Sequence, residues 1–393
     1  MRTYNAAPGV FLLILCLPAC GGETPASPDD AGHAFDTARP DLGTDAPTEV
    51  TEGDYTWVLP PGFAKPVVPA TNPMSKAKVE LGRHLFYDKR LSGNQTQSCA
   101  GCHDQAKAFT DGRALAVGST GAVHPRNSMS LVNLAYFSVY TWGNPLINTL
   151  EQQALLPMFG ESPVELGLSG KEGELLARLR AEPRYAPLFA AAFPGVADPF
   201  TLGSITKALA SFQRSIVSGR SAYDRWYFAG DDAALSPSAQ RGFTLFFGER
   251  LECFHCHGTF AFADSIVYEK KFAEVMFHNT ALYDLDGKGA YPAGNGGTFE
   301  ITHVPSDMGR FRVPSLRNVA VTAPYMHDGS IATLPEVIDH YANGGRASSS
   351  PRKSELIRRF DITAEEKADV VHFLESLTDE PLLTDPRWSD PWK

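Results

Sequence analysis

Two short cysteine–histidine motifs carry the clearest chemical signal in the sequence. Each has the form Cys-x-x-Cys-His, and they occupy residues 99–103 and 253–257. This spacing is typical of c-type haem attachment, in which two cysteines form thioethers with the porphyrin and the histidine binds the iron. The motifs therefore predict two covalent haems. The residues expected to hold them are Cys99, Cys102 and His103 for the first haem, and Cys253, Cys256 and His257 for the second.

A zinc site is the alternative for each Cys-x-x-Cys pair, and it needs further ligands. The chain has six cysteines, and the remaining two are Cys16 and Cys20, which lie within and just after an apolar N-terminal stretch. No other cysteine is left to complete a zinc site, and none is left to build a disulfide. The haem interpretation is therefore favoured.

The sixth ligand of each iron decides what a dihaem chain can do. A Met or His at that position suits electron transfer, whereas an open position lets peroxide bind. Spacing alone leaves several candidates open. They are His124, His278, His303, His327, His340, Tyr341, Met308 and Met326.

The overall composition excludes several classes of protein. Of the 393 residues, 43% are hydrophobic and 20% are charged, as in an ordinary globular protein. The net charge is −10 and basic residues are not concentrated anywhere, so we expect no nucleic-acid partner. No apolar stretch reaches the roughly 18 residues of a membrane span.

The N-terminus has the pattern of a bacterial export leader. An apolar stretch at residues 10–17 is followed directly by Pro-Ala-Cys. The pattern Leu-x-Ala-Cys resembles a lipobox, in which Cys20 becomes the lipidated first residue, and simple secretion with cleavage nearby is the alternative. We expect a leader over residues 1–19, then a lipidated cysteine and a flexible acidic tether over residues 20–54. The protein would then lie on the periplasmic side of the envelope and touch the membrane through a lipid anchor alone.

Helical spacing of apolar residues recurs before both motifs. Residues 75–87 and 236–247 each begin with a serine suited to an N-cap. Further amphipathic helices are predicted over residues 202–216 and after Thr363, which opens a capping box. We therefore predict an all-α, loop-rich fold with two cytochrome c-type haem domains. Their expected bounds are residues 55–220 and 221–393.

Several blocks of sequence resemble the bacterial dihaem cytochrome c peroxidase/MauG superfamily. They lie between about residues 73 and 377 and cover nearly all of the expected folded part. The blocks are residues 98–103 with 109–112, 126–133, Trp142 with 151–157, 312–319 and 322–329. A second set resembles a subgroup, the MbnH-like dihaem lipoprotein enzymes. It comprises residues 55–57, 60–63 and 156–161.

The resemblance implies a peroxidatic first haem with a distal pocket formed by Gln153, Pro157 and Glu165. A carboxylate near the iron can move a proton between the two oxygens of peroxide, and a glutamine can orient peroxide without ionising. An exposed position just before Leu166 is the alternative for Glu165. The resemblance also places Trp142 between the haems, where it would couple them electronically, and an ordinary core tryptophan is the alternative.

A calcium ion between the two domains is a further implication of the resemblance. Its expected ligands are the Asn133 side chain and the backbone carbonyls of Thr322 and Pro324. Hard oxygen ligands of this kind suit Ca²⁺.

Position 341 separates two branches of the superfamily. The peroxidases have a Met there as the sixth ligand of the second haem, whereas MauG-type enzymes have a Tyr, as this chain does in Tyr341. A phenolate ligand favours ferric and higher states of the iron, and a thioether does the opposite. Tyr341 is therefore the expected ligand, with His340 and Met326 as competitors.

These observations lead to one preferred function and two alternatives. We expect hydrogen peroxide to drive the haem pair to a high-valent state that oxidises a Trp or Tyr of a partner protein, as in the MbnH-like conversion of Trp to kynurenine. One alternative is a cytochrome c peroxidase that takes electrons from a small c-type cytochrome or a cupredoxin. The other is a non-catalytic electron-transfer module, in which His124 would close the first iron.

One departure from the MauG type concerns the exit route for oxidising equivalents. MauG-type enzymes carry a surface aromatic residue two positions before the second motif, and this chain has Leu251 there. The exit must therefore differ. Nearby candidates are Tyr223, Trp226, Tyr227 and Phe254.

Overall fold

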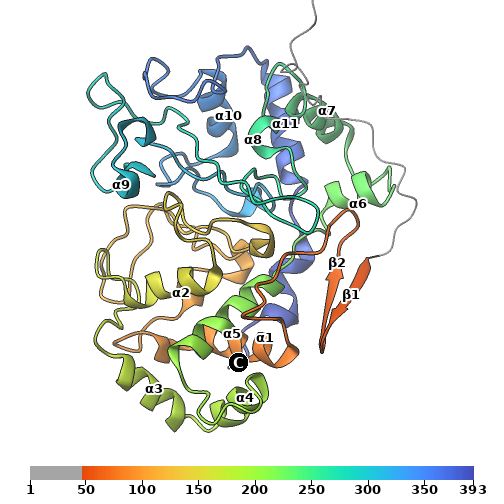
Figure 1. The fold of residues 1–393 in the computed structure, drawn as a ribbon. Coiled ribbons are helices and arrows are strands. Elements are labelled where there is room, and N and C mark those ends of the chain that lie inside the picture. The colour runs from red at the N-terminus through yellow and green to blue at the C-terminus, as the bar shows by residue number, and fades with distance from the viewer. Residues whose placement is uncertain (1–46) are drawn as a thin grey trace, which may run out of the picture. The chain divides into compact units, whose positions relative to one another are not determined.

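Helices joined by long irregular segments make up most of residues 47–393, which are the residues that this computed structural model describes (Figure 1). The leader, Cys20 and most of the predicted tether lie outside the described residues. Among those described, no helix has the length and apolar character needed to span a membrane. The helices are α1 (Lys76–Tyr87), α2 (Leu150–Phe159), α3 (Glu172–Ala181), α4 (Tyr185–Ala192), α5 (Leu202–Ser215), α6 (Ala222–Phe228), α7 (Pro237–Phe246), α8 (Phe254–His257), α9 (Phe299–Thr302), α10 (Leu334–Ala342) and α11 (Ala364–Glu375).

A two-stranded antiparallel hairpin departs from the all-α prediction. Strand β1 (Thr48–Glu52) pairs with strand β2 (Tyr55–Leu59), and Trp57 and Leu59 are buried on one face. They pack with Phe63 and other apolar side chains in one cluster. Strand β1 lies inside the segment predicted as a flexible tether over residues 20–54, so that prediction was wrong at its C-terminal end. The segment forms a strand because pairing with β2 satisfies the backbone hydrogen bonds of β1 and covers one edge of β2.

The N-caps predicted from the sequence are present. The side chains of Ser75 and Ser236 accept hydrogen bonds from backbone N–H groups in the first turns of α1 and α7. Thr363 and Glu366 form the reciprocal capping box of α11. The amphipathic helix predicted after residue 201 is α5, which Thr201 caps. Local caps and apolar spacing thus define these four helices correctly.

Two helix pairs cross in the same way and give the chain an internal repeat. Helix α1 packs against α5, and α7 packs against α11 (Figure 1). A Cβ atom added to Gly82 of α1 would lie 2.0 Å from the carbonyl oxygen of Ala208, and one added to Gly242 of α7 would lie 2.0 Å from that of Asp369. Both crossings therefore depend on a glycine that lets two backbones approach. Each Cys-x-x-Cys-His motif follows the first helix of its pair.

The C-terminal segment returns to the first helix pair rather than staying with the second. The Trp388 ring N–H donates to the hydroxyl of Ser215 at 3.2 Å, and the Tyr87 hydroxyl donates to the Trp388 carbonyl at 2.6 Å. The ring N–H of Trp392 donates to the His84 carbonyl at 2.9 Å. These contacts hold the C-terminal segment against α1 and α5. The segment lies within the second expected domain, residues 221–393, but it packs on helices of the first expected domain.

Candidate active site

The first motif holds its histidine in a fixed orientation. Cys99 begins a short 3-10 turn after α1, and the backbone N–H of His103 donates to the Cys99 carbonyl at 3.0 Å. The His103 ring donates Nδ1–H to the carbonyl of Phe109 at 2.8 Å. Burial lowers the pKa of His103, so the ring is neutral and Nε2 keeps a free lone pair. That nitrogen is available as a metal ligand.

The three residues predicted for the distal pocket meet the first motif at one cavity. Gln153 and Pro157 are four positions apart on α2, so they lie on one helix face. Glu165 follows in a loop that backbone hydrogen bonds tie to Pro157 and Ser119. The cavity measures about 50 Å³. Its lining includes Cys99, Cys102, His103, Gln153, Pro157 and Glu165.

Burial controls the charge of the acidic group in this cavity. It raises the pKa of Glu165 above its usual value. His124 lies close by, with its Nε2 4.0 Å from a Glu165 carboxyl oxygen, and burial lowers the pKa of His124. Because desolvation pushes both groups towards their neutral forms, the pair is a weak contact rather than a strong ion pair. His124 is therefore a neighbour of Glu165 beside this cavity.

A buried ion pair fixes the helix that carries Gln153 and Pro157. Arg214 of α5 is 2% exposed and binds both carboxyl oxygens of Glu151 at 2.8 Å. The Asn72 side chain donates to the same carboxylate at 2.6 Å. Two parallel hydrogen bonds from one guanidinium to one carboxylate fix both the distance between the two groups and their relative orientation. The first turn of α2 is therefore anchored to α5 beside the cavity.

The second motif repeats the first and opens onto a larger cavity of about 240 Å³. The His257 ring donates Nδ1–H to the carbonyl of Phe262 at 2.7 Å, and burial lowers its pKa, which again leaves Nε2 free. The cavity lining includes Cys253, Cys256, His257, Trp142, Tyr341, Met326, His327 and Arg312. Two predicted residues, Trp142 and Tyr341, thus share this cavity with the second motif.

The structure narrows the candidates for a sixth ligand. Tyr341, Met326, His327 and His278 line the second cavity. Both ring nitrogens of the competitor His340 are used by backbone groups, at 2.9 Å from the Thr280 carbonyl and 3.2 Å from the Arg346 N–H. His303 and Met308 lie outside the lining of both cavities described here.

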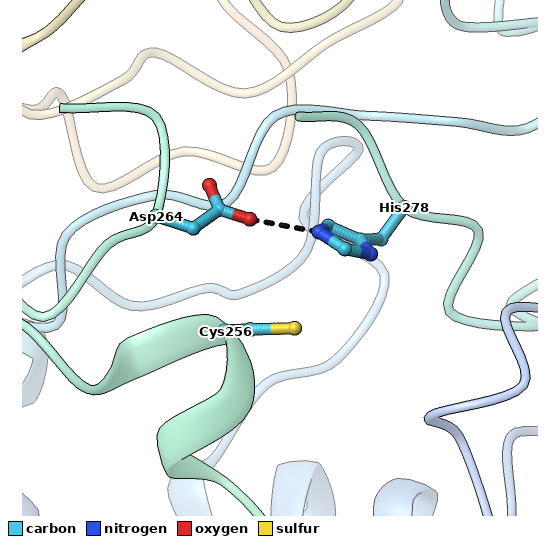
Figure 2. Close-up of side chains that lie close together, drawn as sticks. All are labelled: Cys256, Asp264 and His278. Carbon is cyan, nitrogen blue, oxygen red and sulfur yellow. Dashed lines mark hydrogen bonds and ion pairs between the residues drawn. The ribbon is translucent and has the colours of Figure 1, made fainter. Parts of the chain in front are cut away.

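Cys256 has two possible metal-binding neighbours. Figure 2 shows Asp264 and His278 facing the Cys256 sulfur, and ligand atoms of the three lie within 4.8 Å of one another. The His278 Nε2 is hydrogen-bonded to Asp264 at 2.7 Å, so one nitrogen and one oxygen already have a partner. Cys253, the other cysteine of the motif, lies outside this group. The arrangement is therefore a poor four-ligand zinc site, and an Asp–His pair beside a haem thioether fits it better.

The Asn133 side chain, which is expected to bind calcium, has hydrogen-bond partners of its own in this structure. Its amide accepts from the Ser218 N–H at 2.9 Å and donates to the Ser218 carbonyl at 3.0 Å. The carboxamide that lies against the Pro324 carbonyl, at 3.4 Å, belongs to Asn127. Asn127 was part of a matched sequence block without an assigned role, and its proximity to Pro324 depends on the fold. The calcium site therefore stays a prediction, and in this structure the Asn133 side chain is bonded to Ser218.

The comparisons with known proteins agree with this geometry. A family model described as di-haem cytochrome c peroxidase matches residues 76–233. The methylamine utilization protein MauG of Methylorubrum extorquens is 37% identical over 313 residues, which cover 80% of this chain and 81% of MauG. The chain belongs to the di-haem cytochrome c peroxidase/MauG family. It is therefore an oxidoreductase of the di-haem peroxidase type, which uses peroxide.

Relatives with different names within the di-haem peroxidase/MauG family match about equally well. A cytochrome-c peroxidase of Denitromonas iodatirespirans is also 37% identical, over 345 residues that cover 83% of this chain and 88% of that protein. The crystal structure of a MauG-like protein associated with microbial copper homeostasis is 50% identical, with a TM-score of 0.84, and covers 86% of this chain and 100% of that one. The family thus implies two c-type haems but leaves the reducing substrate open.

Residues of this chain fit two haems of this family. Both motif histidines present Nε2, and all four motif cysteines are free of disulfide bonds. Arg312, which the sequence analysis left without a role, is 3% exposed and lines the second cavity, and its Nε and Nη1 have no partner among the described residues. A buried guanidinium with free N–H groups suits an anionic ligand such as a haem propionate.

Proposed function

We propose that this protein uses hydrogen peroxide to oxidise a tryptophan or tyrosine side chain of a partner protein. The observation that carries the proposal is Tyr341, which lines the second cavity together with His257. A phenolate ligand stabilises oxidised iron, whereas the thioether of a Met stabilises reduced iron. A site with Tyr341 is therefore suited to hold oxidising equivalents rather than to accept electrons from a cytochrome.

Cys99, Cys102 and His103 would hold the first haem, and Cys253, Cys256 and His257, together with Tyr341, would hold the second. When bound, the haems supply the iron that reacts with peroxide and accepts electrons from the substrate. The Nδ1–H bonds to Phe109 and Phe262 orient His103 and His257 towards their irons. Gln153 and Pro157 of α2, which line the first cavity together with His103, would contact the bound peroxide.

Glu165 and Gln153 would divide the work on peroxide between them. The Gln153 carboxamide donates a hydrogen bond that orients the bound molecule. The Glu165 carboxylate would accept a proton from one oxygen of peroxide and deliver it to the other oxygen, which leaves as water. Pro157 has no N–H, so it adds no competing donor to this helix face. Burial keeps the Glu165 pKa raised, which makes the carboxylate a better base once it is ionised.

Trp142 would couple the two sites electronically. Its ring N–H donates to the Asn127 carbonyl at 2.9 Å, and its ring forms part of the wall of the second cavity. Thr110, the residue after the carbonyl that holds His103, lies on the same wall. A fixed aromatic ring between the sites shortens each electron-transfer step.

The cellular setting follows from the N-terminal pattern and from the relatives. We propose that the protein is exported, is lipidated at Cys20 and acts on a partner in the bacterial periplasm. The MauG-like relative at 50% identity is associated with copper homeostasis, and we extend this association to the present chain. Kynurenine formed from a partner Trp is the corresponding product; this four-electron oxidation consumes two molecules of hydrogen peroxide, with water supplying the oxygen atoms and formate as the leaving group.

A bound calcium ion remains part of the proposal, with Asn127 in place of Asn133. The carbonyl oxygens of Arg113 and Pro324 lie 2.6 Å and 3.4 Å from the Asn127 amide nitrogen, and Thr322 is close to Pro324 in sequence. Amide and carbonyl oxygens are suitable Ca²⁺ ligands. Metal analysis of the purified protein, followed by chelation, tests this: we expect one calcium per chain and a lower melting temperature after its removal.

A cytochrome c peroxidase is the second candidate function. Relatives of that name match at the same identity as MauG, and Met326 lines the second cavity with Tyr341. Steady-state peroxide consumption with a reduced small c-type cytochrome separates the two functions. We expect a rate no faster than that of free haem, and rapid saturable turnover would support the peroxidase instead.

A further inference from the structure

Tyr283 is a partly exposed tyrosine whose hydroxyl group donates to a carboxylate. Its O–H lies 2.6 Å from Oδ2 of Asp328. Asp328 is 9% exposed, and its other oxygen accepts the backbone N–H of Ser330 at 3.1 Å. Burial would raise the pKa of Asp328, but the hydrogen bond from Tyr283 and its other partners lower that pKa overall. The carboxylate is therefore ionised and positioned to accept the phenolic proton.

Aromatic side chains connect Tyr283 to the second cavity. The ring centroids of Tyr283 and Tyr291 are 5.5 Å apart. The Tyr291 ring lies 6.1 Å from both Phe311 and His327, which line the cavity that also contains Tyr341. Tyr291, Phe311 and Tyr283 belong to one hydrophobic cluster. A path of neighbouring rings thus leads from the cavity wall towards solvent.

We propose that Tyr283 is the redox-active surface residue through which the partner protein is oxidised. This inference rests on the proposed function. Tyr283 gives one electron, by way of Tyr291, to the haem pair that peroxide has oxidised, and its phenolic proton moves to Oδ2 of Asp328. The resulting tyrosyl radical takes an electron from the partner's aromatic side chain and regains the proton from Asp328. Two such passes use both oxidising equivalents of one hydrogen peroxide.

MauG-type enzymes pass oxidising equivalents to their substrate through a surface aromatic residue, and this chain has no aromatic residue at that position. Leu251, which stands there, is aliphatic and 6% exposed. The aromatic residues of α6 that the sequence suggested are also buried, since Tyr223 is 2% and Trp226 is 8% exposed. Tyr283 combines partial exposure, a short bond to a carboxylate and a ring path to the cavity. It is the position where loss of an electron can be coupled to loss of a proton.

Freeze-quench electron paramagnetic resonance of the haem-loaded protein tests this proposal. One equivalent of hydrogen peroxide is added without a partner protein. We expect a tyrosyl radical signal in the wild type and its loss in Tyr283→Phe. Tyr268→Phe is the matched control, because Tyr268 is also partly exposed but packs in a different cluster, and it should keep the signal. A signal of unchanged size in Tyr283→Phe, or none in the wild type, would overturn the proposal.

Near-infrared absorption in the same samples separates this inference from the proposed function. The band of the coupled haem pair should form in all three proteins and decay several-fold more slowly in Tyr283→Phe. In the wild type, the band should decay more slowly in D₂O than in H₂O, because the proton moves with the electron. For the same reason, the band should decay more slowly in Asp328→Asn than in the wild type. A normal band with unchanged decay in Tyr283→Phe contradicts the inference alone, whereas no band in the wild type contradicts the proposed function as well.

Discussion

The ring of His257 donates its Nδ1–H to the backbone carbonyl of Phe262 at 2.7 Å, and this bond decides which nitrogen faces the second cavity. His103 and Phe109 have the same relationship at 2.8 Å. Both phenylalanines have positive φ angles, 51° and 61°, which turn their carbonyls back onto the rings. The two sites therefore share one construction on the histidine side and differ in the residues around the rest of each cavity.

Tyr341→Phe should change the low-spin haem spectrum of the oxidised protein and raise the reduction potential of the second haem. The phenolate oxygen is lost, so oxidised iron loses its anionic ligand. Absorption spectra and a redox titration measure both effects. Tyr325→Phe is the matched control, because Tyr325 lines the same cavity while its hydroxyl donates to the Val319 carbonyl. An unchanged spectrum in Tyr341→Phe would remove Tyr341 as the ligand.

Glu165→Gln should slow the reaction with peroxide by about 100-fold to 1,000-fold, because the proton carrier is lost while the shape is kept. In the wild type the rate should rise with pH through a pKa above the usual range for Glu, since burial raises that pKa and the carboxylate form is the base. Stopped-flow absorption measures both. Glu161→Gln serves as the control because Glu161 is exposed and bonds to Ser169. A similar loss in both variants would argue against a specific role for Glu165.

Gly82→Ala and Gly242→Ala should each destabilise the fold by about 1–3 kcal/mol, because the new methyl group would lie 2.0 Å from a backbone carbonyl oxygen across the helix crossing. Gly173→Ala is the control: Gly173 is exposed in α3, and its added Cβ would have no atom of another helix or loop within 4 Å. That variant should be neutral or slightly more stable. Thermal unfolding of the three variants provides the measurement, and equal melting temperatures would contradict the close crossings.

Arg214→Met should lower the free energy of unfolding by about 3 kcal/mol at neutral pH, because it leaves the partly buried Glu151 carboxylate without its main partner. Burial alone would raise the Glu151 pKa, but Arg214 lowers it overall. A carboxyl group whose pKa is lower in the folded state stabilises the fold at pH values above its unfolded pKa of about 4.3. This stabilisation is lost as the pH falls through the folded pKa. The difference between wild type and variant should therefore shrink at acidic pH. Denaturant unfolding at several pH values measures it.

The control for this ion pair is Arg180→Met, which removes an exposed partner of Asp198. Screening by solvent leaves such pairs with little effect, so we expect no measurable change. A difference between Arg214→Met and the wild type that stays constant down to pH 3 would contradict the assignment to Glu151.

Local sequence signals predicted four helices well. Ser75, Ser236 and Thr363 are short-range caps, so each was readable from a few neighbouring residues. The resemblance named Gln153, Pro157 and Glu165 together, and they line one cavity with the first motif; their roles there stay a prediction. For the caps, the information lies in contiguous sequence.

Features that depend on contacts between distant segments were less predictable. Strand β1 is acidic and reads as part of a tether until its pairing with β2 is known. Asn127 and Asn133 are both asparagines of one block, and the choice between them depends on the approach of Pro324 from nearly 200 positions away. Arg312 is distinguished by its burial and by its Nε and Nη1, which have no hydrogen-bond partner among the described residues; sequence spacing encodes neither feature.

The most direct test of the central claim is near-infrared absorption after stoichiometric hydrogen peroxide is added to the fully ferric, haem-loaded protein. The account predicts a band from two coupled haems that appears without prior reduction and persists until a partner or Tyr283 supplies electrons. If no band forms until one haem has been reduced, the protein behaves as a gated cytochrome c peroxidase. That result would contradict the assignment of Tyr341 and the proposed oxidation of a partner protein.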